Sequence, residues 1–504
     1  MNGSAAVLVA PNGRQIELNT GLFINNEFVP GSAPPIASIS PANGKEIVSV
    51  QAASSGDVDR AVSAARTAFV DPEWRDLAPA QRGALLFKLA DLVEEHAETL
   101  ATLDAWDNGK PYAVALEEDV AEVASTLRYY AGWADKITGS TMYKAGFTQQ
   151  KLGYTIRQPI GVCAQIIPWN YPLSMASWKL GPAIACGNTV VLKPAEQTPL
   201  SILHFATLVA QAGFPPGVIN IVNGLGRVAG QALVTHKGID KIAFTGSTAT
   251  GKHIMRAAAG NLTNVTLETG GKSPLLVFED ANIEQAAKWA HMGIMSNQGQ
   301  ICTATSRLLV QRSVHARFLD EFVKVMNETT VVGDPFAEGT TQGPQVSQDQ
   351  FEKILGFVKL GKARGATLIA GGEPDKAAST TGGFYIQPTV FGDVTSDMEI
   401  FQEEIFGPVV VATSFDTEEE AIALANNSDY GLGAAVFSKD VERVHRVAER
   451  IDAGMVWINS SQDAEVRLPF GGVKRSGIGR ELGEAGLAAY TQEKAVHVNL
   501  GLRL

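Results

Sequence analysis

Cysteine is scarce in this chain, with three residues among 504. Cys163, Cys186 and Cys302 are too few and too scattered for a disulfide framework or a cysteine-rich zinc site. A chain without disulfides is typical of a reducing compartment, so the sequence predicts a cytoplasmic protein. The eight histidines also lack the spacing of metal ligands, and we expect no bound metal.

Long apolar runs and clusters of basic residues are absent as well. No apolar stretch approaches the roughly 20 residues that span a bilayer, and the early segment AAVLVA lacks the preceding basic residue of a secretory signal. The formal net charge is −12, from 41 basic and 53 acidic residues, which gives no electrostatic footprint for nucleic acid or anionic membrane. We therefore expect a small-molecule partner, with neither nucleic acid nor membrane.

The sequence contains a long alternation of predicted strands and helices. From Val162 onward, short apolar segments rich in β-branched residues, such as VCAQII, TVVLK and KIAF, alternate with segments of helical spacing. This pattern predicts a doubly wound parallel sheet. A second alternating region, from Pro274 to about Tyr430, predicts another α/β domain. Before them, the first 56 residues or so look extended or irregular, and one helical pattern runs from Pro79 to Asn108.

Two glycine-rich segments are candidates for binding phosphate. GLGRVAG, from Gly224 to Gly230, follows a strand and opens a helix, but its spacing is one residue longer than the dinucleotide fingerprint. GSTATGKH, from Gly246 onward, matches a P-loop except that His253 replaces the hydroxyl residue that binds Mg²⁺, which argues against an NTPase. Ser247 and nearby backbone N–H groups can still hold a pyrophosphate at a helix start.

Three side chains suited to acyl chemistry lie near the ends of predicted elements. Cys302 lies among amides and hydroxyls in NQGQICTATS, surroundings that suit a reactive thiol better than an inert one. Glu268 ends the strand NVTLE, where burial would raise its pKa and suit it as a general base. Asn170, held between two prolines in IIPWNYP, can stabilise an oxyanion. Each also has a structural alternative: a small buried hydrophobe, a solvated glutamate and a turn asparagine.

Together these residues indicate acyl chemistry beside a dinucleotide. The chain resembles the aldehyde dehydrogenase superfamily, in its NAD(P)-dependent, acid-forming branch, through the motifs PWNYPL, VLKPAEQTP, FTGST, LETGGKSP, NQGQICTA, EEIFGPV and PFGGVKRSGIGRELG. The resemblance covers nearly the whole chain and implies an α/β fold. That fold would comprise a Rossmann-like NAD-binding domain (1–137 and 158–270), an α/β catalytic domain (271–480), and oligomerisation segments of a homodimer or homotetramer (a β-hairpin within 138–157, and 481–504).

The resemblance also implies a role for each matching residue. Cys302 would attack the aldehyde carbon as thiolate, with the oxyanion held by the Asn170 amide and the Cys302 N–H. Glu268 would then activate water to release a carboxylic acid, with Lys179 as a candidate proton relay. NAD is the implied cofactor and NADP a weaker one. The expected cofactor contacts are Ile166, Trp169, Lys193, Glu196, Gly226, Gly230, Gly246, Ser247, Thr269, Glu404 and Phe406, with Lys193 and Glu196 at the adenosine ribose and Glu404 at the nicotinamide ribose.

The implied substrate tunnel departs from common family patterns. Its expected residues are Tyr171, Ser174, Trp178, Ser296, Ile301, Thr303, Ala464, Phe470, Glu118 and Glu122. Ser296 and Ala464 replace aromatics, which implies a roomier and more polar tunnel, and Thr269 stands beside Glu268 where leucine is common.

Two alternatives for the function stay open. Glu118 and Glu122 form an i,i+4 acidic pair, which is either a solvated helix face or a recognition site for a cationic ω-aminoaldehyde. The alternative of another class is a catalytically silent binding or structural relative. Such a relative would be expected to have lost Cys302 or Glu268, and this chain retains both.

Overall fold

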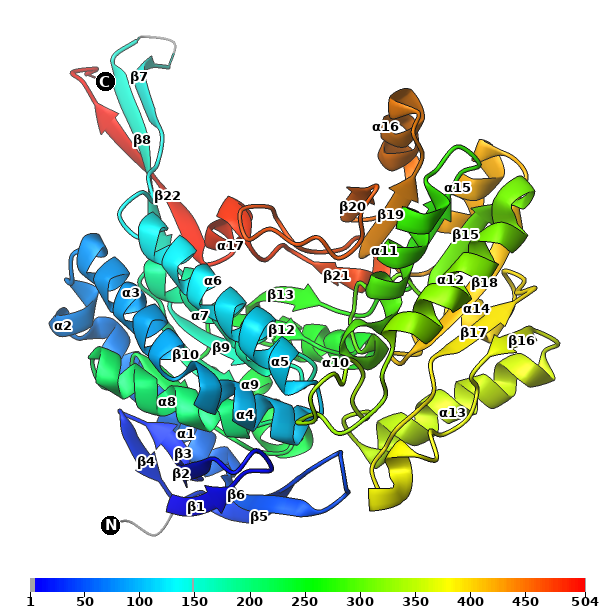
Figure 1. The fold of residues 1–504 in the computed structure, drawn as a ribbon. Coiled ribbons are helices and arrows are strands. Elements are labelled where there is room, and N and C mark those ends of the chain that lie inside the picture. Colours follow the sequence, from blue (N-terminus) through cyan, green and yellow to red (C-terminus); the bar gives the residue numbers. More distant parts are fainter. Residues whose placement is uncertain (1–4, 147–148, 504) are drawn as a thin grey trace.

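The structure is a computed structural model that describes residues 5–146 and 149–503 (Figure 1). Its first large sheet has eight strands in the order β21-β13-β12-β9-β10-β11-β3-β4. The central five are parallel: β13 (Asn264–Glu268), β12 (Lys241–Thr245), β9 (Val162–Ile166), β10 (Thr189–Lys193) and β11 (Ile219–Ile221). The edge strands β21 (Gly477–Ile478), β3 (Leu22–Ile24) and β4 (Glu27–Val29) pair antiparallel. The predicted doubly wound sheet is therefore present.

Successive side chains of these strands point to opposite faces of the sheet, and each face packs on its own hydrophobic core. Cys163, Val190 and Leu192 face one core, whereas Val162 and Val191, one residue out of step, face the other. The helices of the first core are α3 (Pro79–Glu95), α4 (Ala97–Asn108), α6 (Val120–Trp133), α7 (Pro172–Ala185) and α8 (Leu200–Ala212). Those of the second are α1 (Ser55–Val70), α9 (Gln231–Thr235) and α10 (Thr248–Ala259).

The second large sheet has seven strands in the order β16-β17-β18-β15-β14-β19-β20. They are β16 (Thr367–Ala370), β17 (Thr389–Gly392), β18 (Val409–Phe415), β15 (Arg307–Gln311), β14 (Pro274–Val277), β19 (Gly433–Phe437) and β20 (Met455–Ile458), all parallel except β16. One face packs on α11 (Ile283–Met295) and α12 (His315–Thr329). The other packs on α13 (Gln348–Ala363), α14 (Glu399–Gln402), α15 (Glu418–Asn426) and α16 (Val441–Arg450).

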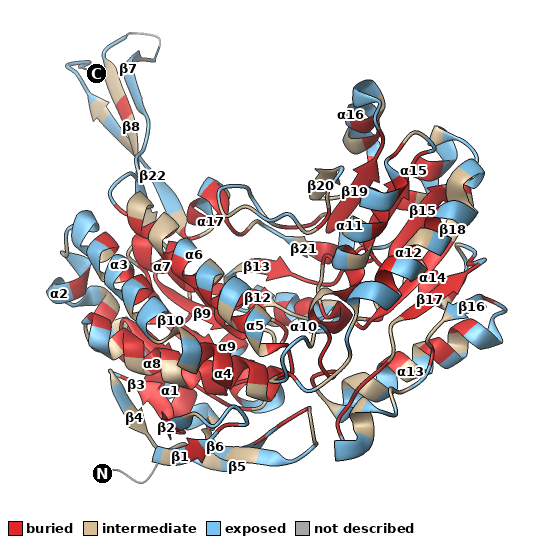
Figure 2. Cartoon of the chain, viewed as in Figure 1, coloured by how far each residue is buried: buried red, intermediate tan, exposed pale blue. Residues whose placement is uncertain are grey.

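A narrow three-stranded sheet projects from the body of the molecule in Figure 1. It consists of β7 (Thr141–Ala145), β8 (Lys151–Pro159) and the C-terminal strand β22 (Thr491–Asn499), and β22 and β7 are its edges. Most of its residues are exposed or half-buried (Figure 2). The domain boundaries proposed from the sequence stay a prediction, and residues 1–4, 147–148 and 504 within them lie outside the described residues.

Several local expectations change in the structure. The predicted helix from Pro79 to Asn108 is two helices, α3 and α4, because the backbone of His96 (φ −101°, ψ 14°) leaves the helical conformation between them. The extended N-terminal region forms the pairs β1 (Ala5–Val9) with β2 (Gln15–Asn19) and β5 (Ala33–Ile39) with β6 (Glu46–Ala52). The short helices α2 (Pro72–Arg75), α5 (Tyr112–Val114) and α17 (Gly483–Ala488) complete the set.

The described residues offer neither a cluster of metal ligands nor a membrane-spanning helix. Among the described residues, no group of three or more His, Cys, Asp or Glu side chains could hold a metal ion. Two histidines that are far apart in the sequence do come close together: His96 Nδ1 lies 3.0 Å from His204 Nε2. No helix in the described ranges is long and apolar enough to cross a membrane.

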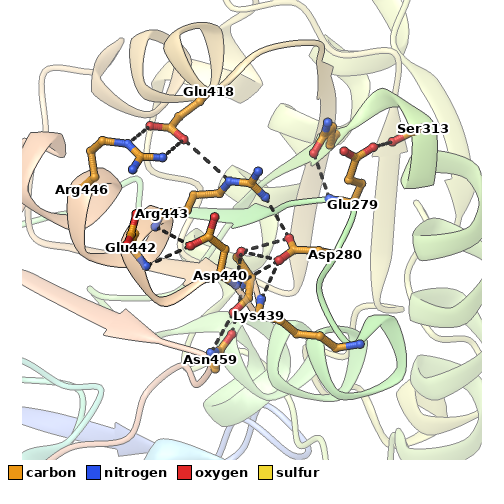
Figure 3. A network of polar contacts seen from close by, with 12 residues as sticks. Glu279, Asp280, Ser313, Glu418, Lys439, Asp440, Glu442, Arg443, Arg446 and Asn459 are labelled. Atoms are coloured by element: carbon orange, nitrogen blue, oxygen red, sulfur yellow. Dashed lines mark hydrogen bonds and ion pairs between the residues drawn. The ribbon is translucent and has the colours of Figure 1, made fainter.

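Asp280 joins the turn after β14 to the start of α16 (Figure 3). Its carboxylate accepts hydrogen bonds from the Ser438 hydroxyl at 2.8 Å and from the Lys439 N–H at 2.9 Å. It also accepts from the Asp440 N–H and from Arg443 Nη1, both at 3.0 Å. Burial by itself raises the pKa of Asp280, but these donors together hold it below its usual value.

We expect Asp280→Asn to loosen α16, because the substitution removes the charge that these donors stabilise. Hydrogen bonds to a charged group contribute about 1.5–3 kcal/mol, so the α16 amides should exchange with solvent roughly 10–100-fold faster. Because the folded pKa is lowered, this contribution is present above the unfolded pKa of about 4 and is lost as the pH falls through the folded pKa. Glu279→Gln, which changes a carboxylate that bonds Ser313 instead, is the control. Equal α16 exchange in both variants would contradict the assignment.

Candidate active site

The segment with Cys302 lies between α11 and β15. Cys302 is half-buried, whereas Cys163 and Cys186 are buried. Burial raises the pKa of the Cys302 thiol to about 12, and the nearby carboxylates of Glu404 and Glu268 act in the same direction. The thiol is therefore neutral in these surroundings, and its ionisation requires a proton acceptor or a nearby positive charge.

Glu268 ends β13 with its side chain only 2% exposed. Among the described residues, neither of its carboxyl oxygens has a hydrogen-bond partner. Burial raises the pKa of Glu268 well above its usual value, and Glu481 raises it further, while Lys179 and Arg480 oppose the shift. A buried carboxyl whose pKa is raised in this way is a candidate general base.

Glu481 is a neighbour of Glu268 that the sequence analysis did not select. Lys179 Nζ lies 2.7 Å from Glu481 Oε1 and donates to Thr245 Oγ1 at 2.7 Å. The side chains of Lys179 and Glu481 are 0% and 4% exposed. Glu481 is distant from Glu268 in sequence, but β21 pairs with the end of β13 and brings the GIGRE segment back beside it. In the sequence, the position of Glu481 within this glycine-rich segment was the signal that could have marked it as a site residue.

Asn170 and Trp169 lie in the turn between β9 and α7. The Asn170 side chain is buried and donates from Nδ2 to the Gln300 carbonyl at 2.9 Å, two residues before Cys302. A carboxamide nitrogen carries two hydrogens, so one N–H is left for a further acceptor. The structure therefore joins the predicted oxyanion donor to the segment that carries the predicted nucleophile.

The residues predicted for the adenosine half of the cofactor lie where the parallel strands of the first sheet end. Lys193 ends β10 and is 2% exposed, with its Nζ 2.8 Å from the Pro194 carbonyl and 3.4 Å from Glu196 Oε2. Burial lowers the pKa of Lys193, and Glu196 opposes the shift. Gly230 lies beside the Lys193 side chain, since a Cβ at Gly230 would come 3.8 Å from Lys193 Cδ. Gly226 faces open space, because a Cβ there would meet nothing within 4 Å.

Gly246 and Ser247 connect β12 to α10. The Ser247 hydroxyl accepts the Thr250 N–H and caps the helix. A Cβ at Gly246 would come 2.6 Å from the Phe244 ring, so a larger residue would displace that ring. Ile166 ends β9 close by. The carboxyl ends of β9, β10 and β12 thus form the edge at which parallel α/β sheets bind nucleotides.

The residues predicted for the nicotinamide half surround the turn after β13. Glu404 Oε1 accepts the Gly271 N–H at 2.8 Å, and burial raises the pKa of Glu404 to about 7. The Thr269 hydroxyl donates to the Arg475 carbonyl at 2.6 Å. The Phe406 ring packs edge-on against Trp169, with centroids 5.2 Å apart. Glu404 also lies near enough to Cys302 to raise the pKa of the thiol.

The groups at this edge of the first sheet match what NAD requires. A dinucleotide needs a strand edge with open backbone, a donor for its pyrophosphate and acceptors for its ribose hydroxyls. The open face at Gly226, the α10 start at Ser247, and the carboxylates of Glu196 and Glu404 provide these groups. Lys193 adds a cation beside Glu196.

The predicted tunnel residues form two groups in the structure. In the first, Trp178 packs on Phe470 with centroids 4.8 Å apart and donates from Nε1 to Glu122 Oε1 at 3.1 Å. Ser174 lies beside Glu122. Burial, the largest cause, raises the pKa of the Tyr171 hydroxyl, and the nearby Asp119, Glu122, Glu118 and Cys302 raise it further.

The second group lies around Cys302 itself. Thr303 and Gln462 exchange two hydrogen bonds, from Thr303 Oγ1 to Gln462 Oε1 at 2.6 Å and from Gln462 Nε2 to the Thr303 carbonyl at 2.8 Å. Gln462, which the sequence analysis did not select, therefore fixes the 459–468 segment to the nucleophile segment. Ile301 and Ser296 are half-buried and Ala464 is exposed. The tunnel role of the residues in both groups stays a prediction.

Comparison with known proteins identifies the class that this fold and site define. The chain matches the Aldehyde dehydrogenase family over residues 28–496. An aldehyde dehydrogenase of Aspergillus niger is 52% identical over 99% of both chains, and aldehyde dehydrogenase [NAD(P)+] 1 of Saccharomyces cerevisiae is 50% identical over 96% of both. An NAD+ complex of a Bacillus cereus aldehyde dehydrogenase superposes with a TM-score of 0.93 at 49% identity, covering 96% of this chain and 97% of that one.

The chain belongs to the aldehyde dehydrogenase family. The predicted fold, the enzyme class and NAD as cofactor are thereby confirmed.

Proposed function

We propose that this enzyme oxidises a small aldehyde to a carboxylic acid through a thioester on Cys302, with water as the acyl acceptor. The observation that carries the proposal is the convergence of three groups from separate segments: the Cys302 thiol, the Asn170 amide bonded to Gln300, and the unpaired Glu268 carboxyl. Glu268 lies close enough to Cys302 to raise the pKa of its thiol.

The proton balance of the proposed reaction follows from these groups. The Cys302 proton passes to an ionised Glu268, and the thiolate sulfur bonds to the aldehyde carbon. The free Asn170 N–H and the Cys302 backbone N–H stabilise the resulting oxyanion. A bound NAD would supply the acceptor for the hydride of the aldehyde carbon. Glu268, after releasing its first proton, takes a proton from water, whose oxygen attacks the thioester and expels the Cys302 thiolate.

Lys179 and Glu481 both influence the pKa of the proposed base, Glu268. Their ion pair has N···O 2.7 Å and is buried, so its field at Glu268 is poorly screened. Lys179 favours the ionised form of Glu268, whereas Glu481 favours the protonated form. Because Lys179 and Glu481 shift the pKa of Glu268 in opposite directions, Glu268 can take a proton both from Cys302 and from water. This supports Lys179 as a candidate proton relay.

A second candidate function is the same chemistry specialised for cationic ω-aminoaldehydes. Burial raises the pKa of Glu118 and of Glu122, and Lys110 opposes the shift at both. Glu122 bonds the Trp178 indole, and an aromatic face beside carboxylates is a surface that binds ammonium groups. A cation bound there would offset the cost of keeping both carboxylates ionised.

Self-association is the remaining part of the proposed function. The apolar side chains of Met142 and Tyr143 on β7 are 62% and 72% exposed. In the second large sheet, β20 is an edge strand beside a groove of about 410 Å³ lined by Trp289, Val441 and Ile458. An exposed apolar strand edge favours strand pairing, so we infer a homodimer or homotetramer. The three free cysteines support a reducing location such as the cytoplasm.

Glu268→Gln tests the proposed base. We expect steady-state turnover to fall by about 10²–10⁴-fold, because the amide cannot take a proton from water, while a rapid burst of NADH formation survives if another acceptor deprotonates Cys302. Stopped-flow absorbance at 340 nm separates the two phases. Cys302→Ala, which cannot form the thioester, should show neither burst nor turnover while still binding NAD. Turnover by Cys302→Ala within tenfold of the wild-type rate would contradict the whole scheme.

The aminoaldehyde candidate is tested by Glu118→Gln/Glu122→Gln. We expect kcat/KM for 4-aminobutanal to fall relative to that for a neutral aldehyde of similar length, mainly through KM, because the pair would touch the end remote from the reacting carbon. Glu117→Gln makes the same chemical change on an exposed neighbour and is the matched control. An unchanged ratio of the two kcat/KM values in the double variant rules out charge recognition by this helix.

The inferred oligomer is tested by Met142→Asp/Tyr143→Asp. Light scattering should give two or four times the 53.4 kDa chain mass for the wild type and a lower mass for the variant, because buried unpaired charges disfavour an interface. Val9→Asp, at another apolar residue that is 69% exposed, should leave the mass unchanged. A wild-type protein of one chain mass would refute the inference.

A further inference from the structure

Side-chain amides connect the segment that carries Cys302 to the turn that carries Asn170. Asn170 Nδ2 donates to the Gln300 carbonyl at 2.9 Å, and Asn297 Nδ2 donates in return to the Asn170 carbonyl, also at 2.9 Å. Asn297 Nδ2 lies 3.4 Å from the Gln300 carbonyl as well. The Asn170 turn follows β9 of the first sheet, and the nucleophile segment leads into β15 of the second. Each segment nevertheless binds the backbone of the other through a buried asparagine.

The backbone of the nucleophile segment aims Asn297 at this contact. Asn297, Gln298 and Gly299 have φ values of 46°, 58° and 70°, three consecutive residues in the left-handed region. Asparagine tolerates this conformation better than most residues. Gly299 cannot be replaced easily, because its Cβ would overlap the Gly407 carbonyl group. The turn is therefore defined by packing as well as by hydrogen bonds.

The orientation of the Asn297 amide is itself fixed by Gln298. With its amide oriented to satisfy its neighbours, Gln298 donates to Asn297 Oδ1 at 3.0 Å and accepts the Gly343 N–H at 2.8 Å. Because Oδ1 is then occupied as an acceptor, Nδ2 is the end that faces the Asn170 carbonyl. The donor direction in the contact with Asn170 is thus determined by a third residue.

Asn108 holds the other side of the same turn. It is the last residue of α4, is 0% exposed, and donates from Nδ2 to the Trp169 carbonyl at 2.6 Å. Its Nδ2 also lies 3.4 Å from the Asn170 carbonyl. Two asparagines from distant parts of the chain therefore restrain the two carbonyls around Asn170. Asn297 is the one that belongs to the nucleophile segment.

We propose that Asn297 is a positioning residue, which sets the Asn170 amide relative to Cys302. The proposal rests on the proposed function, in which Asn170 donates to the oxyanion. One Asn170 N–H is used on the Gln300 carbonyl, so the direction of the second N–H depends on how the turn sits against the nucleophile segment. A displacement of about 1 Å in such a donor can cost on the order of 10²-fold in rate.

Two substitutions separate the Asn297 amide from the Asn297 backbone. Asn297→Gly removes the amide but keeps the left-handed conformation without strain. Asn297→Asp keeps the size and the tolerance of that conformation but replaces the donor by an oxygen. Asn26→Gly is the matched control, because Asn26 also has a positive φ (61°) and donates from Nδ2 to a carbonyl, that of Phe214 at 2.6 Å, in the β3–β4 turn.

We expect kcat to fall roughly 10–100-fold in both Asn297 variants. The NAD dissociation constant from fluorescence titration and the melting temperature should stay near their wild-type values, and Asn26→Gly should match wild type in kcat. Asn170→Ala should cost on the order of 10²–10³-fold. If Asn297 acts through Asn170, adding Asn297→Gly to Asn170→Ala should change kcat by less than about threefold, because the group being positioned is already gone.

The outcomes distinguish this proposal from the proposed function. Wild-type kcat in Asn297→Gly, or losses that multiply fully in the double variant, would overturn the positioning role while leaving Asn170 as the donor. Weakened NAD binding or a lowered melting temperature in both Asn297 variants would overturn it as well, by indicating a structural role. Wild-type kcat in Asn170→Ala would instead remove the oxyanion assignment, and the positioning role with it.

Discussion

The site depends on keeping the Glu268 carboxyl out of water, with no hydrogen-bond partner in the part of the chain that the structure describes. Burial of such a group costs several kcal/mol in its charged form, so burial raises the pKa of Glu268 well above its usual value. The position exists because β13 ends there in the junction between the two large sheets. The antiparallel strand β21 then closes over the end of β13 and adds Glu481 beside the carboxyl.

The same dry junction explains the state of Cys302. Desolvation and two nearby carboxylates hold the thiol in its protonated form. A permanently ionised thiolate would be exposed to oxidation, whereas a thiol that ionises only when a proton acceptor or a positive charge is present is protected between turnovers.

Two other buried charged side chains do have polar partners. Lys110 forms ion pairs with Asp104 at 3.5 Å and with Asp119, and its Nζ lies 4.2 Å from the centre of the Tyr171 ring. Arg307, also buried, donates to the Lys272 carbonyl and to carbonyls at the end of α15. Among the described residues, both oxygens of the Glu268 carboxyl lack a hydrogen-bond partner, as does the buried Lys272 Nζ. A fully paired carboxylate would have a lowered pKa and would be a poor proton carrier.

Sequence patterns were enough to predict the elements with strong periodicity. The strands VCAQII and TVVLK became β9 and β10, because a β-branched run between turns has few other ways to be buried. The helix break at His96 escaped prediction, since the apolar spacing continues through it and only the backbone angles reveal it. Short-range spacing therefore determined element type better than element boundaries.

The sequence by itself determined the fold, the enzyme class and NAD as cofactor, because unusual local motifs such as NQGQICTA and LETGGKSP carry that chemistry in consecutive residues. Tertiary structure alone decided which groups meet. Glu481 reaches Glu268 through the β21–β13 pairing, Gln462 bonds Thr303, and Asn108 and Asn297 hold the Asn170 turn. These residues are up to 213 positions apart in the sequence or belong to different sheets. A local sequence pattern does not encode such contacts, because the segments meet only when both sheets have formed.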